Sequence, residues 1–332
     1  MDRSVTVKIL RTKVFGRSPV GAFLRLNKHI YGYFSPRITK LGLMRVYGNW
    51  LHALVRMYTK RAFYFGTFFL RNRPQLARRL SRQTRKRTSL TITILAPSIG
   101  AEVYSILWTI RSKRPDLKVV ANAVDISKEA LEFAKNGVYP LGYSEFAHEH
   151  IFASVTQEEM LELFDNEGDR VRIKAWLREG IIWRAGDAAD PQLATLLGPQ
   201  DMIFANNFLC HMYPADAERC LRNIVQLVKP GGYLFVSGID LDVRTRVARD
   251  LMLEPITDSI EDIHSGDSSL TRDWPLTYWG LEPFNMRRRD WRIRYSSAFR
   301  VPQYNCGGAA SPEKPAMIKV HSASYKSSIG PS

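Results

Sequence analysis

Apolar positions in the middle of the chain follow two patterns, continuous runs and helical spacing. Leu90–Leu95 form a mostly apolar stretch of the kind that buried strands show. A turn containing Gly100 follows, and residues 117–124 form a second run that ends on Asp125. Between the turn and Pro115, apolar residues recur at helical spacing: Val103, Ile106, Leu107 and Ile110. The pattern therefore predicts a strand–helix–strand unit.

The same alternation continues as far as Gly238. Ser127 suits the N-cap of a helix and Gly137 its C-terminal end, and residues 138–179 are predicted to be irregular and helical. The remaining elements are strands over 181–183, 202–205 and 233–238, helices over 128–135 and 216–228, a helical start over 243–253 and an alternating final strand over 290–301. Strands alternating with helices favour an α/β fold with a doubly wound, mostly parallel sheet.

Three segments differ in composition. Residues 1–87 interleave aromatic and basic side chains, which predicts a small helical N-terminal domain followed by a basic linker. Residues 88–302 hold the alternating elements. In residues 303–332, Pro, Gly, Ser, Ala and Lys dominate, which is typical of a disordered tail.

The net charge of +16 is concentrated at the N-terminus. Residues 1–90 contain 21 Lys and Arg and one acid, whereas the remainder contains 27 Lys and Arg and 31 acids. A field of this kind attracts a negatively charged partner, which could be an acidic protein, a nucleic acid or an anionic membrane surface. The alternative is a helical subdomain with its aromatic side chains inward and its basic side chains in solvent.

Cysteine usage and hydropathy bear on location. The three cysteines, Cys210, Cys220 and Cys306, are odd in number and have no metal-like spacing, which favours a reducing cytoplasm. Every apolar run is shorter than the roughly 18 residues that span a bilayer, so no transmembrane segment is expected. His148 and His150 would point in different directions on a helix, and no metal site is expected.

Polar residues follow the predicted strands at their carboxyl ends, where parallel sheets bind ligands. They are Gly100, Asp125, Asp187 and the pair Asn206 and Asn207. Backbone N–H groups at a turn and an acid that accepts ribose hydroxyls would together bind a nucleoside. The dinucleotide fingerprint has three glycines and this turn has one, so an ordinary strand–helix–strand unit is the alternative.

Several stretches resemble the S-adenosylmethionine-dependent chemotaxis-receptor methyltransferases of the CheR type, which methylate glutamate side chains. The likeness extends over about residues 60–240 and is most specific in Ala96–Ser105, which retains a serine, a glycine, a glutamate, a tyrosine and a serine of the family loop. The other similar stretches are Thr67–Asn72, Val124–Ser127, Asn207 and Lys229–Gly232. The resemblance implies a Rossmann-like class I methyltransferase fold and S-adenosylmethionine as the cofactor.

The resemblance also implies roles for individual residues. Glu102 would pair with the α-amino group of the cofactor, and its alternative role is to complement the helix dipole. Asp125 would accept the ribose hydroxyls, and Asp187 with the Ala188 amide would read the adenine edge. Arg71 would reach the carboxylate of the cofactor or of the acceptor. The cofactor set is completed by Ser98, Gly100, Asn206 and Asn207.

The chain departs from the family pattern on the acceptor side. Asn206 stands where the family has an arginine, and His211 stands where an aromatic hydroxyl is expected. A carboxylate acceptor is ionised at pH 7 and needs no base, whereas a hydroxyl acceptor would use His211 as one. The first hypothesis is therefore O-methylation of a protein carboxylate. The alternatives are a methyltransferase for a small molecule or polysaccharide, and a nucleic-acid-binding methyltransferase or inactive binder. The sequence does not indicate an oligomeric state.

Overall fold

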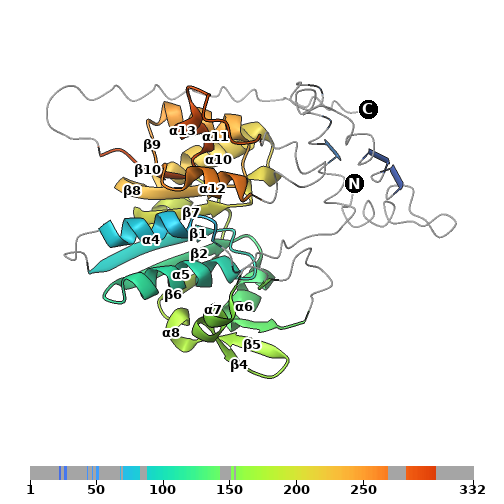
Figure 1. Ribbon diagram of the computed structural model, residues 1–332, viewed down its shortest axis with the longest axis vertical. Coiled ribbons are helices and arrows are strands. Elements are labelled where there is room, and N and C mark those ends of the chain that lie inside the picture. The colour runs from blue at the N-terminus through green and yellow to red at the C-terminus, as the bar shows by residue number, and fades with distance from the viewer. Residues whose placement is uncertain are drawn as a thin grey trace, which may run out of the picture. The chain divides into compact units, whose positions relative to one another are not determined.

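The computed structural model describes residues 70–82, 88–142, 155–267 and 282–303, with residues 68, 151 and 152 and isolated positions between 22 and 51 (Figure 1). The chain divides into two units, Met1–Pro302 and Gln303–Ser332, and the second lies outside the described residues apart from Gln303. The helical N-terminal domain, its boundary at residue 87 and the disordered tail therefore stay predictions. No helix among the described residues is long and apolar enough to cross a bilayer.

A seven-stranded, mostly parallel sheet forms the centre of the described structure (Figure 1). Its strands lie in the order β6 (Ile181–Ala185), β2 (Lys118–Asp125), β1 (Ser89–Leu95), β7 (Gln200–Asn206), β8 (Val228–Ser237), β10 (Ala298–Arg300) and β9 (Glu254–Pro255). Strand β1 pairs in parallel with β2 on one side and β7 on the other, while β10 runs antiparallel to β8 and β9. The predicted doubly wound α/β fold is confirmed. The strand order reverses beside β1, and such switch points bind ligands at the carboxyl ends of the strands.

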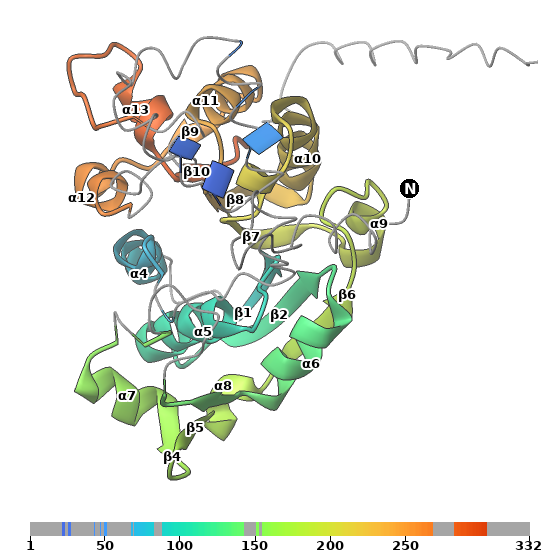
Figure 2. The same cartoon turned by 90° about the vertical axis from the view of Figure 1, so that its right-hand side faces the viewer.

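Alternate side chains of each buried strand supply two separate cores. In β7, Met202 and Phe204 pack with α4 (Arg73–Arg82) and α5 (Ala101–Lys113). Ile203 and Ala205 face α10 (Pro214–Gln226) and α11 (Leu241–Asp250) on the opposite side (Figure 2). A continuous apolar run, buried on both faces, is what a strand in this position requires.

Residues 138–179 contain strands that the sequence did not predict. They form an antiparallel sheet in the order β3 (Val138–Pro140), β5 (Arg170–Ile173) and β4 (Phe164–Asn166), together with α7 (Gln157–Leu163) and α8 (Ala175–Arg178). The expectation of an irregular and helical segment was wrong for these strands, because three or four residues are too few to show alternation. Their stability comes from tertiary packing, since Phe68 contacts Tyr139 and Phe164 edge-on, with ring centroids 4.9 and 5.0 Å apart.

The end of the chain also differs from the prediction. Residues 290–301 form a short helix, α13 (Trp291–Tyr295), before β10, rather than one strand. The remaining elements are α6 (Lys128–Asn136), α9 (Leu193–Leu197), the 3₁₀ turn η2 (Leu209–His211) and α12 (Ile260–Ser265). Ser127 caps α6 by accepting from the Ala130 amide, as expected for this N-cap.

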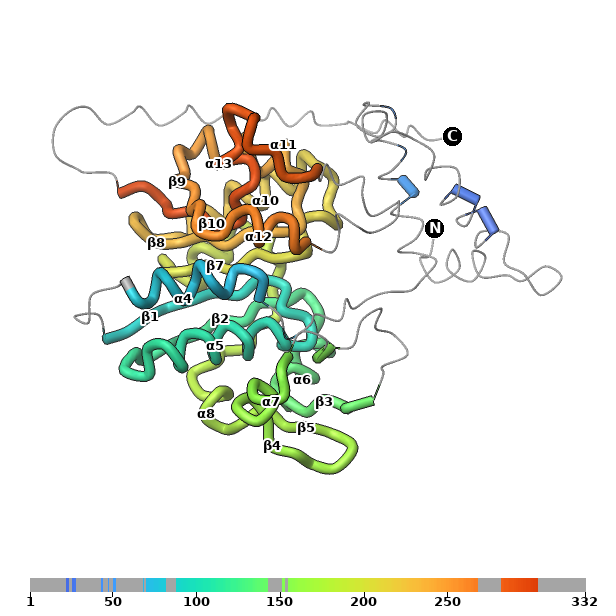
Figure 3. Tube along the Cα trace, viewed as in Figure 1, coloured from blue at the N-terminus to red at the C-terminus, as the bar shows by residue number. Residues whose placement is uncertain are grey.

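Helix α4 is tied to the C-terminal part of the described structure (Figure 3). The Gln75 amide donates to the backbone oxygens of Ile256 and Asp258, at 3.1 and 2.9 Å. The Asn72 amide donates to the hydroxyl of Ser297 at 2.8 Å. Because both amides are buried, these bonds fix the start of α4 and therefore Arg71, two positions before it.

Candidate active site

The turn after β1 is shaped by one glycine. Gly100 has φ +84°, and a Cβ at this position would lie 2.7 Å from Cβ of Ala134 and 3.2 Å from the Trp183 ring. Ala96 and Ser98 in the same turn also have positive φ, 53° and 51°. Backbone strain of this kind persists only where the surroundings hold it, and it gathers at functional sites. The turn brings the backbone of α5 close to α6 in a way that another residue at position 100 would prevent.

The carboxylate of Asp125 joins two loops at the end of β2. Its oxygens accept from the amides of Ser98, at 2.9 Å, and Ser127, at 2.8 Å. The Asp125 residue is buried, and the backbone oxygen of the same residue accepts from the Gly186 amide at the end of β6. Since each carboxylate oxygen can accept more than one hydrogen bond, Asp125 keeps capacity for a ligand hydroxyl.

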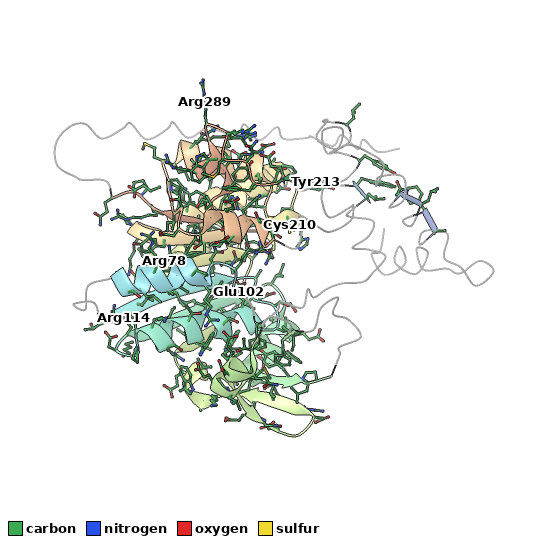
Figure 4. The ribbon with its side chains drawn as sticks, viewed as in Figure 1. Arg78, Glu102, Arg114, Cys210, Tyr213 and Arg289 are labelled. Carbon is green, nitrogen blue, oxygen red and sulfur yellow. The ribbon has the colours of Figure 1, made fainter. Side chains whose placement is uncertain are left out.

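Glu102 and Asn206 meet where β1 and β7 end. The Asn206 amide donates to Oε1 of Glu102, and its Oδ1 accepts from the Ser237 hydroxyl at 2.8 Å. Burial raises the pKa of Glu102, and the Asn206 hydrogen bond and the positive charge of Arg71 oppose part of that rise. A partly desolvated carboxylate of this kind gains most from a cationic ligand, because an added positive charge offsets its lost hydration. Figure 4 shows Glu102 near the start of α5.

Arg71 lies two residues before α4, and one nitrogen of its guanidinium makes an ion pair. Its Nη1 donates to Oδ2 of Asp267, the residue two positions after α12, at 2.5 Å. The Nε of Arg71 is buried and has no hydrogen-bond acceptor among the described residues. Buried donors are normally paired, so this N–H is suited to an anionic ligand atom. Arg71 and Glu102 thus place opposite charges at the same edge of the sheet.

The charges of Arg71 and Asp267 also shift the pKa values of two other buried groups, Arg244 and His264. Burial lowers the pKa of Arg244 to about 10, with Asp267 opposing the shift and Arg294 and Arg71 adding to it. Burial also lowers the pKa of His264, whose Nε2 donates to the backbone oxygen of Glu282 at 2.7 Å. His264 is therefore neutral at pH 7. Asp267 interacts electrostatically with the guanidinium groups of both Arg71 and Arg244.

Asp187 and Ala188 lie in the loop after β6. Oδ1 of Asp187 accepts from the Ala189 amide at 2.8 Å, which makes a local turn, and the residue is exposed. The backbone oxygen of Ala188 accepts from the Cys220 thiol. The Gly186 hydrogen bond to Asp125 keeps this loop beside the end of β2, so an exposed acid and a backbone amide stand next to the predicted ribose site.

Asn207, His211 and their neighbours continue from β7. Asn207 adopts φ 58°, which asparagine tolerates, and the missing Cβ of Gly238 allows the two backbones to approach. His211 ends η2, and its Nε2 lies 3.7 Å from the sulfur of Cys210. Figure 4 shows Cys210 and Tyr213 on the same side of the molecule as the start of α5.

Residues outside the predicted set of site residues support the turn. The hydroxyl of Tyr139, in β3, donates to the backbone oxygen of Ile99 at 2.7 Å. The hydroxyl of Tyr104 donates to the backbone oxygen of Ala134 at the same distance. Asp267 was missed as well, because its partner Arg71 is 196 positions away and no local pattern relates them. His148 and His150 lie outside the described residues, within which no cluster of metal-ligating side chains occurs.

Comparison with known proteins identifies the family. The model of the "CheR methyltransferase, SAM binding domain" matches residues 67–241, more than half of the chain. The chain belongs to the CheR methyltransferase family. The cofactor of this CheR domain is S-adenosylmethionine, as its sequence predicted. The matched range includes every predicted site residue from Arg71 to His211 and ends before Arg244 and Asp267.

Curated relatives of this CheR-family chain are chemotaxis enzymes. The chemotaxis protein methyltransferase of Vibrio parahaemolyticus is 29% identical over 147 residues, which are 42% of this chain and 50% of the relative. The chemotaxis protein methyltransferase Cher2 of Pseudomonas putida is 31% identical over 148 residues, with the same shares. The chain thus matches about half the length of these relatives. A solved N-methyltransferase, NodS from Bradyrhizobium japonicum with S-adenosyl-l-homocysteine, is 17% identical, with a TM-score of 0.32 over 57% of this chain and 78% of NodS.

Proposed function

We propose that this chain is an S-adenosylmethionine-dependent O-methyltransferase whose acceptor is a carboxylate, a glutamate side chain of a protein. The observation that carries the proposal is the proximity of opposite charges: a half-buried Glu102, bonded to Asn206, interacts electrostatically with the guanidinium of Arg71, whose Nε has no acceptor among the described residues. These opposite charges lie at the switch point of the sheet, where α/β folds bind ligands. A zwitterionic amino-acid group suits them.

Two features of the chain fit this cofactor. The buried Nε of Arg71 is a donor without an acceptor among the described residues, which suits the α-carboxylate, while Glu102 suits the α-amino group. The glycine at position 100 lets the turn after β1 pack closely against Ala134 of α6, which fixes the backbone of this turn beside the predicted site. Both features concern the amino-acid end of the cofactor and the turn beside it.

The other predicted residues would hold the nucleoside end. Asp125 would accept the ribose hydroxyls while Ser98 and Ser127 fix its carboxylate. Asp187 and the Ala188 amide would bind the adenine edge. Asn206 would hold Glu102 in place, and Asn207 would shape the end of β7.

The chemistry asks mainly for positioning. Bound S-adenosylmethionine supplies a methyl group on a positively charged sulfur. The residues of the chain would align the acceptor in line with that methyl group and exclude water from it. A carboxylate acceptor is ionised at pH 7, so no residue has to remove a proton. Arg71 would orient a carboxylate at this edge, that of the cofactor or that of the acceptor.

A second candidate is O-methylation of a small molecule or polysaccharide. The replacement of the family arginine by Asn206, and the presence of His211 beyond β7, favour it. A hydroxyl acceptor has to lose a proton, and an imidazole is suited to accept it near neutral pH. In that case His211 would be the catalytic base.

The first proposal includes a docking mode and a location. The basic N-terminal residues would attract an acidic face of the acceptor protein in the cytoplasm. The experiment uses the full chain, S-adenosylmethionine labelled on its methyl group, and membranes that contain chemotaxis receptors. Label released as methanol by mild base identifies a methyl ester, and Asp125→Ala serves as the inactive control.

Each outcome separates the candidates. Base-labile label on the receptor supports carboxylate methylation. Base-stable label on a sugar or small molecule, lost in His211→Ala, supports the second candidate. Salt-sensitive binding to nucleic acid without methyl transfer to either acceptor would contradict both and favour a nucleic-acid binder.

A further inference from the structure

The ion pair between Arg71 and Asp267 connects two distant parts of the chain beside the predicted active site. Arg71 precedes α4 and lies within the family match, whereas Asp267 follows α12, beyond it. Side chains of both residues are largely buried, with 20% and 10% exposed. Because Asp267 lies outside the family match, this ion pair is a feature of the packing of this chain.

Asp267 uses only one end of the Arg71 guanidinium. The hydrogen bond runs from Nη1 of Arg71 to Oδ2 of Asp267, and the buried Nε of Arg71 meets no acceptor among the described residues. A carboxylate that occupied the place of the cofactor carboxylate would be expected to accept from two nitrogens of the Arg71 guanidinium, as arginine and carboxylate commonly pair. The one-sided contact leaves the Nε side of the guanidinium available for another anion.

Arg244 explains why a negative charge is needed at Asp267. Two of its nitrogens donate to the backbone oxygens of Val236, at 3.3 Å, and Arg294, at 2.9 Å, so this guanidinium is fixed in the core. The charges of Asp267 and Arg71 shift the pKa of Arg244 in opposite directions, so all three groups interact. Without the Asp267 carboxylate, the positive charge of the fixed Arg244 would repel Arg71. Arg71 is the more exposed of the two arginines, so its side chain would be the one to move away.

We propose that Asp267 is a positioning residue that holds the Arg71 guanidinium by Nη1, so that its Nε side binds the α-carboxylate of the cofactor. This inference rests on the proposed function, in which Glu102 and Arg71 bind the amino-acid end of S-adenosylmethionine. It assigns a role in cofactor binding to a segment outside the matched family domain. It also predicts that removing the Asp267 carboxylate weakens cofactor binding. If Asp267 instead competed with the cofactor for Arg71, its removal would strengthen binding.

The test compares two ligands by calorimetry. S-adenosylhomocysteine carries the amino-acid end, whereas 5′-methylthioadenosine lacks it. Asp267→Asn should weaken binding of S-adenosylhomocysteine by about tenfold, or about 1.4 kcal/mol, because Arg71 is then no longer held in place. Binding of 5′-methylthioadenosine should stay unchanged, which a general loosening of the fold would not allow.

Asp258→Asn is the matched control. Asp258 also pairs with arginines of α4, Arg78 and Arg79, but these lie further along the helix and away from Arg71. This variant should bind both ligands like the wild type. Asp267→Ala provides a second variant if the asparagine variant does not fold. In an Arg71→Gln background, Asp267→Asn should cost almost nothing more, because its effect acts through Arg71.

Four results would overturn the inference. Unchanged binding of S-adenosylhomocysteine by Asp267→Asn would remove the positioning role and leave the proposed function intact. Tighter binding would make Asp267 a competitor for Arg71, and equal weakening of both ligands would make it a general structural residue. A wild-type chain that binds neither ligand would contradict the inference and the proposed function together.

Discussion

At the scale of single residues, the candidate site holds a charge that destabilises the empty fold. Glu102 is half-buried, and its pKa is raised above the ordinary value of 4.5 because loss of hydration disfavours the ionised form. Asn206 and Arg71 offset only part of that penalty. A carboxylate kept under these conditions is more easily explained by a cationic ligand than by fold stability.

Glu102→Gln should therefore stabilise the free protein at pH 7, by about 1 kcal/mol. A raised pKa in the folded state means that the penalty is present above that pKa and disappears as the pH falls below 4.5, the ordinary value. Urea unfolding at pH 7 and pH 4 should show the gain at the higher pH alone. Glu129 is an exposed first-turn acid of α6, and Glu129→Gln should instead lose a few tenths of a kcal/mol. A loss in both variants would mean that Glu102 only complements the helix dipole.

The same residue predicts how cofactor affinity depends on pH. Glu102 has to be ionised to pair with an ammonium group, so affinity for S-adenosylhomocysteine should fall as the pH drops through its raised pKa. Calorimetry between pH 5 and 8 checks this, at constant ionic strength. Glu102→Gln should bind at least tenfold more weakly at pH 7 and show a flatter profile. A wild-type affinity independent of pH would contradict the assigned role.

Asp125 and His211 are expected to separate cofactor binding from catalysis. Asp125→Ala should abolish detectable binding of S-adenosylhomocysteine, because it removes the ribose acceptor and the link between the loops of Ser98 and Ser127. His211→Ala should leave binding intact. Calorimetry on both variants, with circular dichroism to verify folding, gives the answer. Retained binding in a folded Asp125→Ala variant would disprove the ribose assignment.

At the scale of elements, prediction from sequence succeeded where a pattern is local and long enough. Strand β1, helix α5 and the Ser127 cap each have their signal within a few residues. The strands of the β3–β5–β4 sheet have three or four residues and are held by aromatic contacts such as that of Phe68 with Phe164. The partners of the site residues could not be predicted either, because they are distant in the sequence and only the fold brings them together. Asp267 pairs with Arg71, and Tyr139 donates to the backbone oxygen of Ile99.

The turn at Gly100 permits a test of why its glycine is required. Gly100→Ala should lower the free energy of unfolding by about 2–4 kcal/mol, because positive φ and the close approach to Ala134 both oppose a Cβ. Gly168 has a similar φ of +81° and nothing within 4 Å, so Gly168→Ala isolates the backbone term and should cost about 1 kcal/mol. Urea unfolding measures both. Adding Ala134→Gly to Gly100→Ala should recover only part of the loss, and equal costs for the two glycines would contradict the packing argument.

At the scale of the whole molecule, charge is divided between the two ends of the chain. The first 90 residues carry 21 Lys and Arg against one acid, while the remainder has slightly more acids than bases. Apart from Arg71, the predicted cofactor site lies within the remainder, where short-range contacts among buried groups dominate. Salt screens exposed charges over about 8 Å at physiological ionic strength but affects buried pairs much less. Acceptor docking and cofactor binding should therefore respond differently to salt.

Raising the salt concentration from 50 to 500 mM should increase the KM for an acidic acceptor protein several-fold and change the affinity for S-adenosylhomocysteine less than twofold. Steady-state methylation and calorimetry on the full chain check the two values. Replacing Arg85, Lys86 and Arg87 with Gln should reproduce part of the KM increase at low salt, since these three adjacent charges belong to the basic N-terminal region. Arg287, Arg288 and Arg289 are a matched basic run near the other end, and the same replacement there should have a smaller effect on KM. Equal effects of the two triple variants would show that acceptor docking depends on total charge, and the assignment of the acidic partner to the N-terminus would then be wrong.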